Sequence, residues 1–201
     1  MVAIIDYGLG NLISVKKALN FLEIPNLITF DKREIINSTS IILPGVGSFQ
    51  QGMRNLRERG LIDILTNEVM VKKKKFLGIC LGMQLIFETG TEPNFSNGLG
   101  WLKGKVEKIK TKDLELPHLG WNNIKNSNSS NYEDTIESNF YFIHSYHVLP
   151  RNVSDIESYV FYGKDLISSI KKDNIFATQF HPEKSQKAGL NLLSKYFKNN
   201  A

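Results

Sequence analysis

The amino-acid sequence predicts an α/β protein with a central, mostly parallel sheet flanked by helices and a mixed or antiparallel extension in its second half. In the first half, short apolar runs alternate with amphipathic stretches, which is typical of strand–helix–strand units. Beyond Trp101 the pattern changes to closely spaced strands. A chain of 201 residues suffices for one sizeable core and is short for two, so we expect residues 1–201 to form a single domain.

The first half is expected to hold four buried strands and the helices between them. Apolar side chains recur at helical spacing across residues 12–22, and Pro25 interrupts the chain after them. Ser48 is of a residue type that caps helices. The predicted strands are residues 2–6, 26–30, 40–43 and 76–80, and the predicted helices are residues 12–22, a helix after Ser48 carrying Met53, Leu56 and Leu61, and residues 81–88.

The second half is expected to be mainly strands. An Asn- and Ser-rich stretch, residues 122–139, contains little that could enter a core, which favours a surface loop or hairpin tip. A last helix is predicted at residues 187–197, with apolar side chains on one face. The predicted strands are residues 105–110, 141–149, 159–162 and 167–170.

Composition narrows the class of protein. Apolar residues make up 41%, and no apolar run approaches the roughly 18 to 20 residues of a membrane span. The start of the chain lacks the features of a secretory signal, so we expect a soluble, cytoplasmic protein without a membrane partner. One cysteine and four scattered histidines do not form a metal-ligand set, and we expect neither metal nor cofactor.

The net charge of +5 is modest, and four consecutive lysines, residues 72–75, contribute to it. Such a run could contact nucleic acid or an acidic partner. No aromatic residues are interleaved with it, so a solvated connection between a helix and a strand is the preferred interpretation, and no nucleic-acid partner is expected.

Cys80 is placed where α/β proteins position their sites. It joins a predicted strand to a predicted helix, and Gly78 and Gly82 flank it at the spacing of a nucleophile elbow. The amino end of the helix would stabilise a thiolate, and the Leu81 N–H would be free to bind an oxyanion. A tight turn around a buried, inert cysteine explains residues 78–82 equally well. A general base elsewhere in the chain is needed to decide whether Cys80 is a nucleophile.

His181 and Glu183 are the candidates for that base and its orienting group. Pro182 disfavours helix at His181, and an extended segment would project both side chains from one side. His181 would then take the thiol proton and later protonate the leaving group, while Glu183 orients the ring. The other three histidines are expected to be structural rather than catalytic: His118, His144 and His147.

These motifs together resemble the class I glutamine amidotransferase family, and more narrowly the glutaminase subunits of imidazole glycerol phosphate synthases. The resemblance extends over nearly the whole chain and implies a flavodoxin-like fold. The motifs are Asp6-Tyr7-Gly8-Leu9-Gly10-Asn11, Pro44-Gly45-Val46-Gly47, Gly78-Ile79-Cys80-Leu81-Gly82-Met83-Gln84, Pro117-His118-Leu119-Gly120-Trp121-Asn122, Tyr141-Phe142-Ile143-His144-Ser145-Tyr146 and Gln179-Phe180-His181-Pro182-Glu183-Lys184-Ser185.

The resemblance implies that Cys80 attacks the side-chain amide of glutamine, giving a thioester and ammonia, after which water releases glutamate. Val46 or Gly47 would supply a second oxyanion N–H beside Leu81. The substrate's amino-acid end would be held by Gln84 and by the backbone around His144, Ser145 and Tyr146.

The resemblance also implies a (β/α)8 cyclase as partner in a heterodimer. Ammonia would pass to an enzyme-bound ribonucleotide, yielding imidazole glycerol phosphate and an aminoimidazole carboxamide ribotide, as in histidine biosynthesis. Four residues match positions of that interface: Asn11, Trp121, Tyr141 and Lys184. Core packing for Trp121 and a solvated Lys184 are the alternatives.

Other functions remain open. A paralogous glutaminase could serve a cyclase-like partner that aminates or amidinates a surface sugar. A non-catalytic regulatory subunit and a stand-alone cysteine hydrolase are further alternatives. Gly8-Leu9-Gly10 does not predict a nucleotide site, because the third glycine and the acidic residue of a dinucleotide fingerprint are missing.

Overall fold

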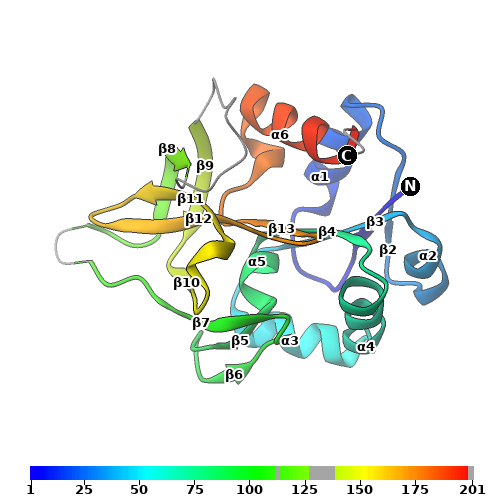
Figure 1. Ribbon diagram of the computed structural model, residues 1–201, viewed down its shortest axis with the longest axis horizontal. Helices are drawn as coiled ribbons and strands as arrows, with labels where there is room; N and C mark the ends of the chain where they lie inside the picture. The colour runs from blue at the N-terminus through cyan, green and yellow to red at the C-terminus, as the bar shows by residue number, and fades with distance from the viewer. Residues whose placement is uncertain (112–113, 127–138, 199–201) are drawn as a thin grey trace.

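The computed structural model of the chain describes residues 1–111, 114–126 and 139–198. A nine-stranded sheet crosses the molecule with helices on both faces, and a four-stranded sheet packs beside it (Figure 1). The order of the large sheet is β2-β1-β3-β4-β13-β12-β11-β8-β9, and that of the small sheet is β10-β7-β5-β6.

The strands and helices have the following bounds. The strands are β1 Val2–Ile5, β2 Asn26–Thr29, β3 Ser40–Gly45, β4 Lys75–Cys80, β5 Phe87–Gly90, β6 Ser96–Asn97, β7 Leu102–Lys108, β8 His118–Asn126, β9 Asn139–His144, β10 Tyr146–Pro150, β11 Ile156–Phe161, β12 Asp165–Lys172 and β13 Ile175–Thr178. The helices are α1 Leu12–Phe21, α2 Lys32–Asn37, α3 Phe49–Glu58, α4 Ile62–Thr66, α5 Leu81–Leu85 and α6 Gln186–Lys198, with a π-helix at Asn67–Val71 and 3-10 turns at Val153–Asp155 and Pro182–Lys184.

The parallel half of the large sheet confirms the predicted fold class. β2, β1, β3, β4 and β13 run parallel, in the flavodoxin-like order, and β12, β11, β8 and β9 continue the sheet with antiparallel pairs. Within β1, Ala3 and Ile5 enter one core while Val2 and Ile4 enter the other, as expected for a strand buried on both faces.

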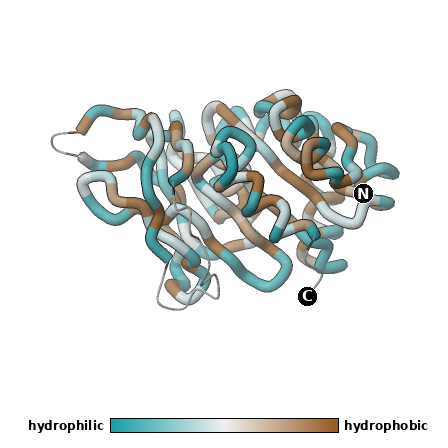
Figure 2. Tube along the Cα trace, turned by 90° about the horizontal axis from the view of Figure 1, so that it is seen from above, coloured by the Kyte–Doolittle hydropathy of each residue, from teal (hydrophilic) through white to brown (hydrophobic). Residues whose placement is uncertain are grey.

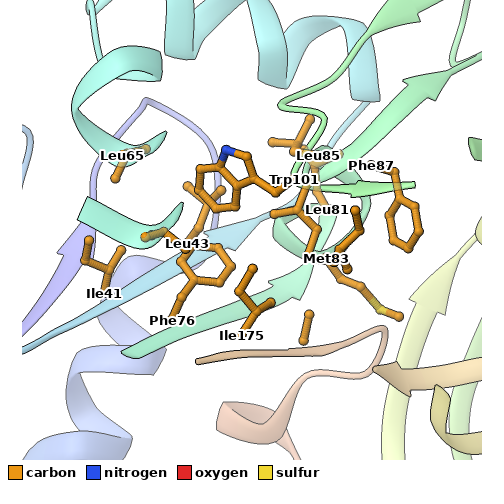
Figure 3. Close-up of a cluster of buried hydrophobic side chains, with 14 of the residues drawn as sticks. Ile41, Leu43, Leu65, Phe76, Leu81, Met83, Leu85, Phe87, Trp101 and Ile175 are labelled. Carbon is orange, nitrogen blue, oxygen red and sulfur yellow. The ribbon is translucent and has the colours of Figure 1, made fainter. Parts of the chain in front are cut away.

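The helices form two layers around this sheet. α1 and α6 lie on one face, and α3, α4 and α5 lie on the other (Figure 1). On the second face the Trp101 ring meets the Phe76 ring edge-on at 5.1 Å between centroids, within a cluster that also takes Leu43, Leu65 and Leu85 (Figure 3). Hydrophobic stretches run through the central strands, whereas the outer loops are largely hydrophilic (Figure 2).

Side-chain caps begin α1 and α3, and the cap at Ser48 was predicted. Ser48 Oγ accepts from the Gln51 N–H at the start of α3, and Asn11 Oδ1 accepts from the Ser14 N–H at the start of α1. The predicted last helix is also present, as α6.

The predicted helix at residues 81–88 is wrong beyond Leu85. α5 ends there, and the chain turns into β5, which pairs with β7 in the small sheet. Along this path Gly90 packs directly against Phe49, since a Cβ at Gly90 would lie 2.5 Å from the Phe49 ring. Helical apolar spacing carried no information about this tertiary pairing.

Two further predictions in the second half are corrected. The strand predicted at residues 141–149 is divided at Ser145: β9 belongs to the large sheet and β10 to the small one. Residues 122–126, predicted as part of a loop, continue β8, and Asn139 begins β9, while residues 127–138 lie outside the described residues. The Asn side chains of β8 are tolerated because this end of the sheet is exposed on alternate residues.

The lysine run is not a simple solvated connection. The Lys74 side chain is only 9% exposed, and its Nζ lies 2.8 Å from Glu68 Oε2 and donates to the carbonyls of Ile35 and Ile36. The Lys75 Nζ lies 4.7 Å from the centre of the Tyr196 ring. These two lysines contact the π-helix and α6, so their charges have a structural role.

No helix in the described part of the chain is long and apolar enough to cross a membrane.

Candidate active site

Cys80 lies at a sharp corner between β4 and α5. Its backbone has φ +53°, a left-handed value that non-glycine residues rarely adopt, and α5 begins at the next residue. A Cβ at Gly82 would lie 1.8 Å from the Leu43 carbonyl oxygen, and one at Gly78 would lie 2.9 Å from the Gly82 oxygen. Both glycines are therefore required by close backbone approach, and the corner has the form of the predicted nucleophile elbow.

Neighbouring parallel strands bring other segments level with Cys80. Gly45 at the end of β3 is its register partner on one side. On the other side Thr178 pairs with Ile79, so the chain after β13 continues directly past the sulfur. The carboxyl ends of β3, β4 and β13 thus meet at one edge, which is where open α/β sheets form sites.

His181 and Glu183 form a buried pair at this edge. His181 Nδ1 lies 2.8 Å from Glu183 Oε1, and both side chains are 2% exposed. His181 is extended, as predicted, but Pro182 starts a 3-10 turn rather than a longer extended segment. This turn places the Glu183 carboxylate against the His181 ring. The predicted pairing of the two side chains is therefore produced by a 3-10 turn and not by an extended segment. The His181 N–H also donates to the Tyr141 carbonyl, which ties the segment to β9.

Charge at the site favours a protonated His181. Burial lowers the pKa of this imidazole, but the negative charges of Cys80 and Glu183 outweigh burial and hold the pKa well above its usual value. Glu183 occupies Nδ1, so the interaction with Cys80 that raises this pKa is made at Nε2. The Cys80 Sγ also lies 3.8 Å from the Ile143 carbonyl oxygen. The ring is thus oriented by Glu183 and keeps one nitrogen available for proton transfer.

A pocket of about 340 Å³ opens beside Cys80. Its size suits a small molecule rather than a macromolecule. Its lining includes every residue predicted for the oxyanion hole and for substrate binding: Val46, Gly47, Leu81, Gln84, His144, Ser145 and Tyr146. Ser48, Glu92, Pro117 and Ile143 complete the lining beside Cys80. The structure therefore brings these predicted residues together with the predicted nucleophile.

The predicted partner-facing residues gather on a neighbouring surface. Trp121 on β8 and Tyr141 on β9 are register partners, and their ring centroids are 6.0 Å apart. Lys184 Nζ lies 5.6 Å from the centre of the Tyr141 ring. Trp121 is 46% exposed, which argues against core packing. Asn11 caps α1, and α1 contacts the turn that holds Lys184.

Among the described residues, no group of three or more histidine, cysteine, aspartate or glutamate side chains could hold a metal ion.

Comparison with known proteins identifies the family. A model of the class-I glutamine amidotransferase family matches residues 3–199. The chain belongs to this family. The glutamine amidotransferase is 43% identical over 201 residues to a protein of Methanococcus maripaludis named imidazole glycerol phosphate synthase subunit HisH 2, covering 98% of this chain and 99% of that one. It is 42% identical to the Campylobacter jejuni protein named subunit HisH 1, covering 98% and 100% of the two chains.

A solved structure titled as a glutamine amidotransferase has the same fold. Its TM-score with this amidotransferase is 0.72 at 18% identity, and the match covers 97% of each chain. At that identity the likeness supports the fold alone.

Sequence reasoning gave no role to two buried side chains of the amidotransferase's site. Gln179 Nε2 lies 3.6 Å from Cys80 Sγ, although Gln179 was considered only as part of a motif. Tyr7 is fully buried beneath Gly45, and its hydroxyl has no hydrogen-bond partner among the described residues. The strand register could have indicated Gln179, since it follows the residue paired with Ile79.

Proposed function

We propose that this chain is the glutaminase subunit of an imidazole glycerol phosphate synthase, which hydrolyses glutamine and delivers ammonia to a (β/α)8 cyclase subunit in the cytoplasm. Full-length similarity at 42–43% to proteins of that name supports the assignment. The observation that carries the chemistry is the juxtaposition of the Cys80 elbow, the buried His181–Glu183 pair and the adjoining pocket.

In the proposed reaction, the thiol proton of Cys80 resides on His181, giving a thiolate–imidazolium pair in agreement with the raised pKa of the ring. The imidazolium is stabilised by Glu183, whose Oε1 faces Nδ1 at 2.8 Å. The thiolate then attacks the side-chain amide carbon of glutamine. The carbon–sulfur bond forms as the amide carbonyl becomes an oxyanion.

The oxyanion would be stabilised by backbone N–H groups at the mouth of the pocket. The Leu81 N–H belongs to the first turn of α5, and Val46 or Gly47 lies across the pocket. Removing one such donor typically costs about 2.7 to 4 kcal/mol of transition-state stabilisation. Collapse of the intermediate breaks the carbon–nitrogen bond, and the proton on His181 goes to the departing ammonia.

Water completes the cycle. His181 accepts a proton as water attacks the thioester carbon, and the sulfur leaves as glutamate is released. The net reaction is glutamine plus water to glutamate plus ammonia. The amino-acid end of the substrate would be held around Gln84, His144, Ser145 and Tyr146, which line the pocket together with Cys80.

The cyclase would dock on the surface of Trp121, Tyr141 and Lys184, with Asn11 at its edge. This surface combines exposed aromatic area with a cation, a composition typical of interface hot spots. Because the His181 N–H is bound to Tyr141 O, a partner contacting this strand would lie next to the catalytic segment. Ammonia could then leave the pocket without entering bulk solvent.

The test is glutamate release by the chain alone and with the cyclase and its ribonucleotide ligand. We expect slow release alone, a marked increase in the complex, and no release by Cys80→Ala. When ammonium salts replace glutamine as the nitrogen donor, the complex that carries Cys80→Ala should still form imidazole glycerol phosphate. Undiminished glutamate release by that variant would disprove the nucleophile, and full activity of the wild-type chain without a partner would disprove ammonia delivery.

The acceptor has one alternative with a specific basis. The relatives include chains numbered HisH 1 and HisH 2, so some organisms carry a second chain of this name. A second chain could serve a cyclase-like partner that aminates or amidinates a surface-sugar precursor. Copurification of the partner from the native organism distinguishes the two: a partner that makes no imidazole glycerol phosphate would support the alternative.

A further inference from the structure

The side-chain amide of Gln179 contacts the sulfur of Cys80. Its Nε2 lies 3.6 Å from Sγ, within hydrogen-bonding range for a sulfur acceptor, and the residue is fully buried. The parallel pairing of β13 with β4 fixes this position, because Thr178 is level with Ile79 and the next residues on both strands come side by side. A buried amide group at this distance from the sulfur can influence the charge state of Cys80.

The hydrogen-bond partners assign which end of the amide faces the sulfur. The Tyr146 carbonyl oxygen can only accept, so the atom of Gln84 that lies 3.1 Å from it is Nε2. The same Nε2 lies 3.1 Å from Gln179 Oε1. The oxygen of Gln179 therefore points to Gln84, and its NH₂ group points to Cys80.

A second chain of bonds fixes the Tyr146 carbonyl. His144 Nδ1 lies 2.9 Å from it and must be the donor, so His144 Nε2 accepts from His118 Nδ1 at 3.0 Å. His118 Nε2 then accepts from Asn122 Nδ2 at 3.2 Å. Burial lowers the pKa of His118 to about 4 and of His144 to about 3, so both rings stay neutral and keep these tautomers near pH 7.

Resting on the proposed function of Cys80, we propose that Gln179 is a further catalytic residue whose Nε2–H donates to the Cys80 thiolate and stabilises it. In the thiol form, the sulfur donates toward the Ile143 carbonyl. Once the proton has moved to His181, the sulfur can only accept, and a carbonyl oxygen no longer stabilises it. The Gln179 amide then donates a hydrogen bond to the thiolate, and the hydrogen bond from Gln84 Nε2 to Gln179 Oε1 holds the amide in that orientation.

The test is the pH dependence of Cys80 alkylation by iodoacetamide, followed between about pH 5 and pH 10. Cys80 is the only cysteine of the chain, so the label reports on this thiol alone. In Gln179→Met, which keeps the length and removes the donor, we expect the midpoint to rise by about one pH unit and the rate at pH values below both midpoints to fall about tenfold. The other titratable groups around the site are unchanged in this variant: His181, Glu183, Tyr7, His144, Tyr146 and Glu92.

The matched control is Gln50→Met, the same exchange at an exposed position of α3, which should give the wild-type profile. A Gln179→Met profile that overlays the wild type would overturn the proposal, even if the variant is less stable, because a structural role alone lowers the melting temperature without moving the midpoint.

Gln84→Met provides a second arm should Gln179→Met fail to fold. It leaves the Gln179 donor in place but removes the hydrogen bond to its Oε1, so we expect a smaller rise of the midpoint, corresponding to about a two- to fivefold lower rate at pH values below both midpoints. An unchanged midpoint would refute the proposed orientation. Alkylation needs neither glutamine nor the cyclase, so these outcomes are independent of whether the chain delivers ammonia to the proposed partner.

Discussion

His181 Nδ1 and Glu183 Oε1 are 2.8 Å apart, and neither side chain is more than 2% exposed. Two residues separated only by a proline thus form a buried pair next to Cys80, with the second ring nitrogen facing away from the carboxylate. The carboxylate fixes the tautomer of the imidazole and, together with Cys80, raises its pKa. Most of the proposed proton transfers depend on this one contact.

Replacing the carboxylate by an amide should therefore reduce turnover without disturbing the site's shape. In Glu183→Gln, the amide NH₂ can donate to Nδ1 and favour the wrong tautomer, so we expect kcat for glutamate release to fall about 100- to 10,000-fold. The measurement is steady-state release in the complex with the cyclase. Glu58→Gln, the same exchange at an exposed position of α3, should retain full turnover. Equal rates for the two variants would exclude the orienting role of Glu183.

The sequence predicted the nucleophile corner because its requirements are local. Glycines at fixed distances from Cys80, a strand before it and a helix after it are all visible within a few residues, and the structure adds only the contacts that make Gly78 and Gly82 necessary. The parallel half of the sheet was predictable for a similar reason, since each buried strand is a short apolar run between helices.

The second half was less predictable because its elements are defined by pairing between distant segments. Ser145 separates two strands that belong to different sheets, and nothing in the continuous apolar run around it indicates the break. Gln179 was missed for the same reason: its role depends on lying level with Cys80, which is 99 residues away in sequence. Lys74 shows the converse error, since a charge-rich run was interpreted without knowing that Glu68 is buried beneath it.

The buried lysine should make a large contribution to stability. Lys74→Met leaves Glu68, whose side chain is 1% exposed, with one fewer cation, and it also removes donors from the carbonyls of Ile35 and Ile36. We expect the free energy of unfolding to fall by about 3 kcal/mol. Lys73 is the matched control, because its ion pair with Asp173 is 3.7 Å long and well exposed. Lys73→Met should cost less than about 0.5 kcal/mol in chemical denaturation, and similar losses for both variants would contradict the buried network.

The neutral histidines predict how stability depends on pH. Burial is the largest cause that lowers the pKa of His147, to about 4, so below about pH 6.5 the unfolded chain binds a proton that the folded chain does not. The free energy of unfolding should therefore fall as the pH drops from about 6.5 to about 4. His118 and His144 act in the same direction. His181 has a raised pKa, so its contribution is present below about pH 6.5 and is lost as the pH rises through the raised value.

The variant His147→Gln isolates one of these protons. Its unfolding free energy, measured by denaturant titration, should fall less steeply than that of the wild type between about pH 6.5 and pH 4, by up to about 1.4 kcal/mol per pH unit. Parallel curves for the two proteins would mean that His147 is protonated in the folded state. The same pair of proteins should show parallel curves above about pH 7.5, where His147 is neutral in both states.

Removing the buried hydroxyl of Tyr7 should not destabilise the protein. It lies beneath Gly45, has no hydrogen-bond partner among the described residues, and burial is the largest cause that raises its pKa. Desolvating an unpaired hydroxyl costs about 1 to 3 kcal/mol, so Tyr7→Phe should leave the folded state equally stable or stabilise it by up to about 1 kcal/mol. Tyr196→Phe is the same exchange where the hydroxyl donates to the Phe76 carbonyl at 2.7 Å, and it should destabilise by about 1 kcal/mol. The melting temperature of Tyr7→Phe should thus be equal to or above that of the wild type, and that of Tyr196→Phe below it. If Tyr7→Phe is the more damaging exchange, the Tyr7 hydroxyl has a partner in the folded protein.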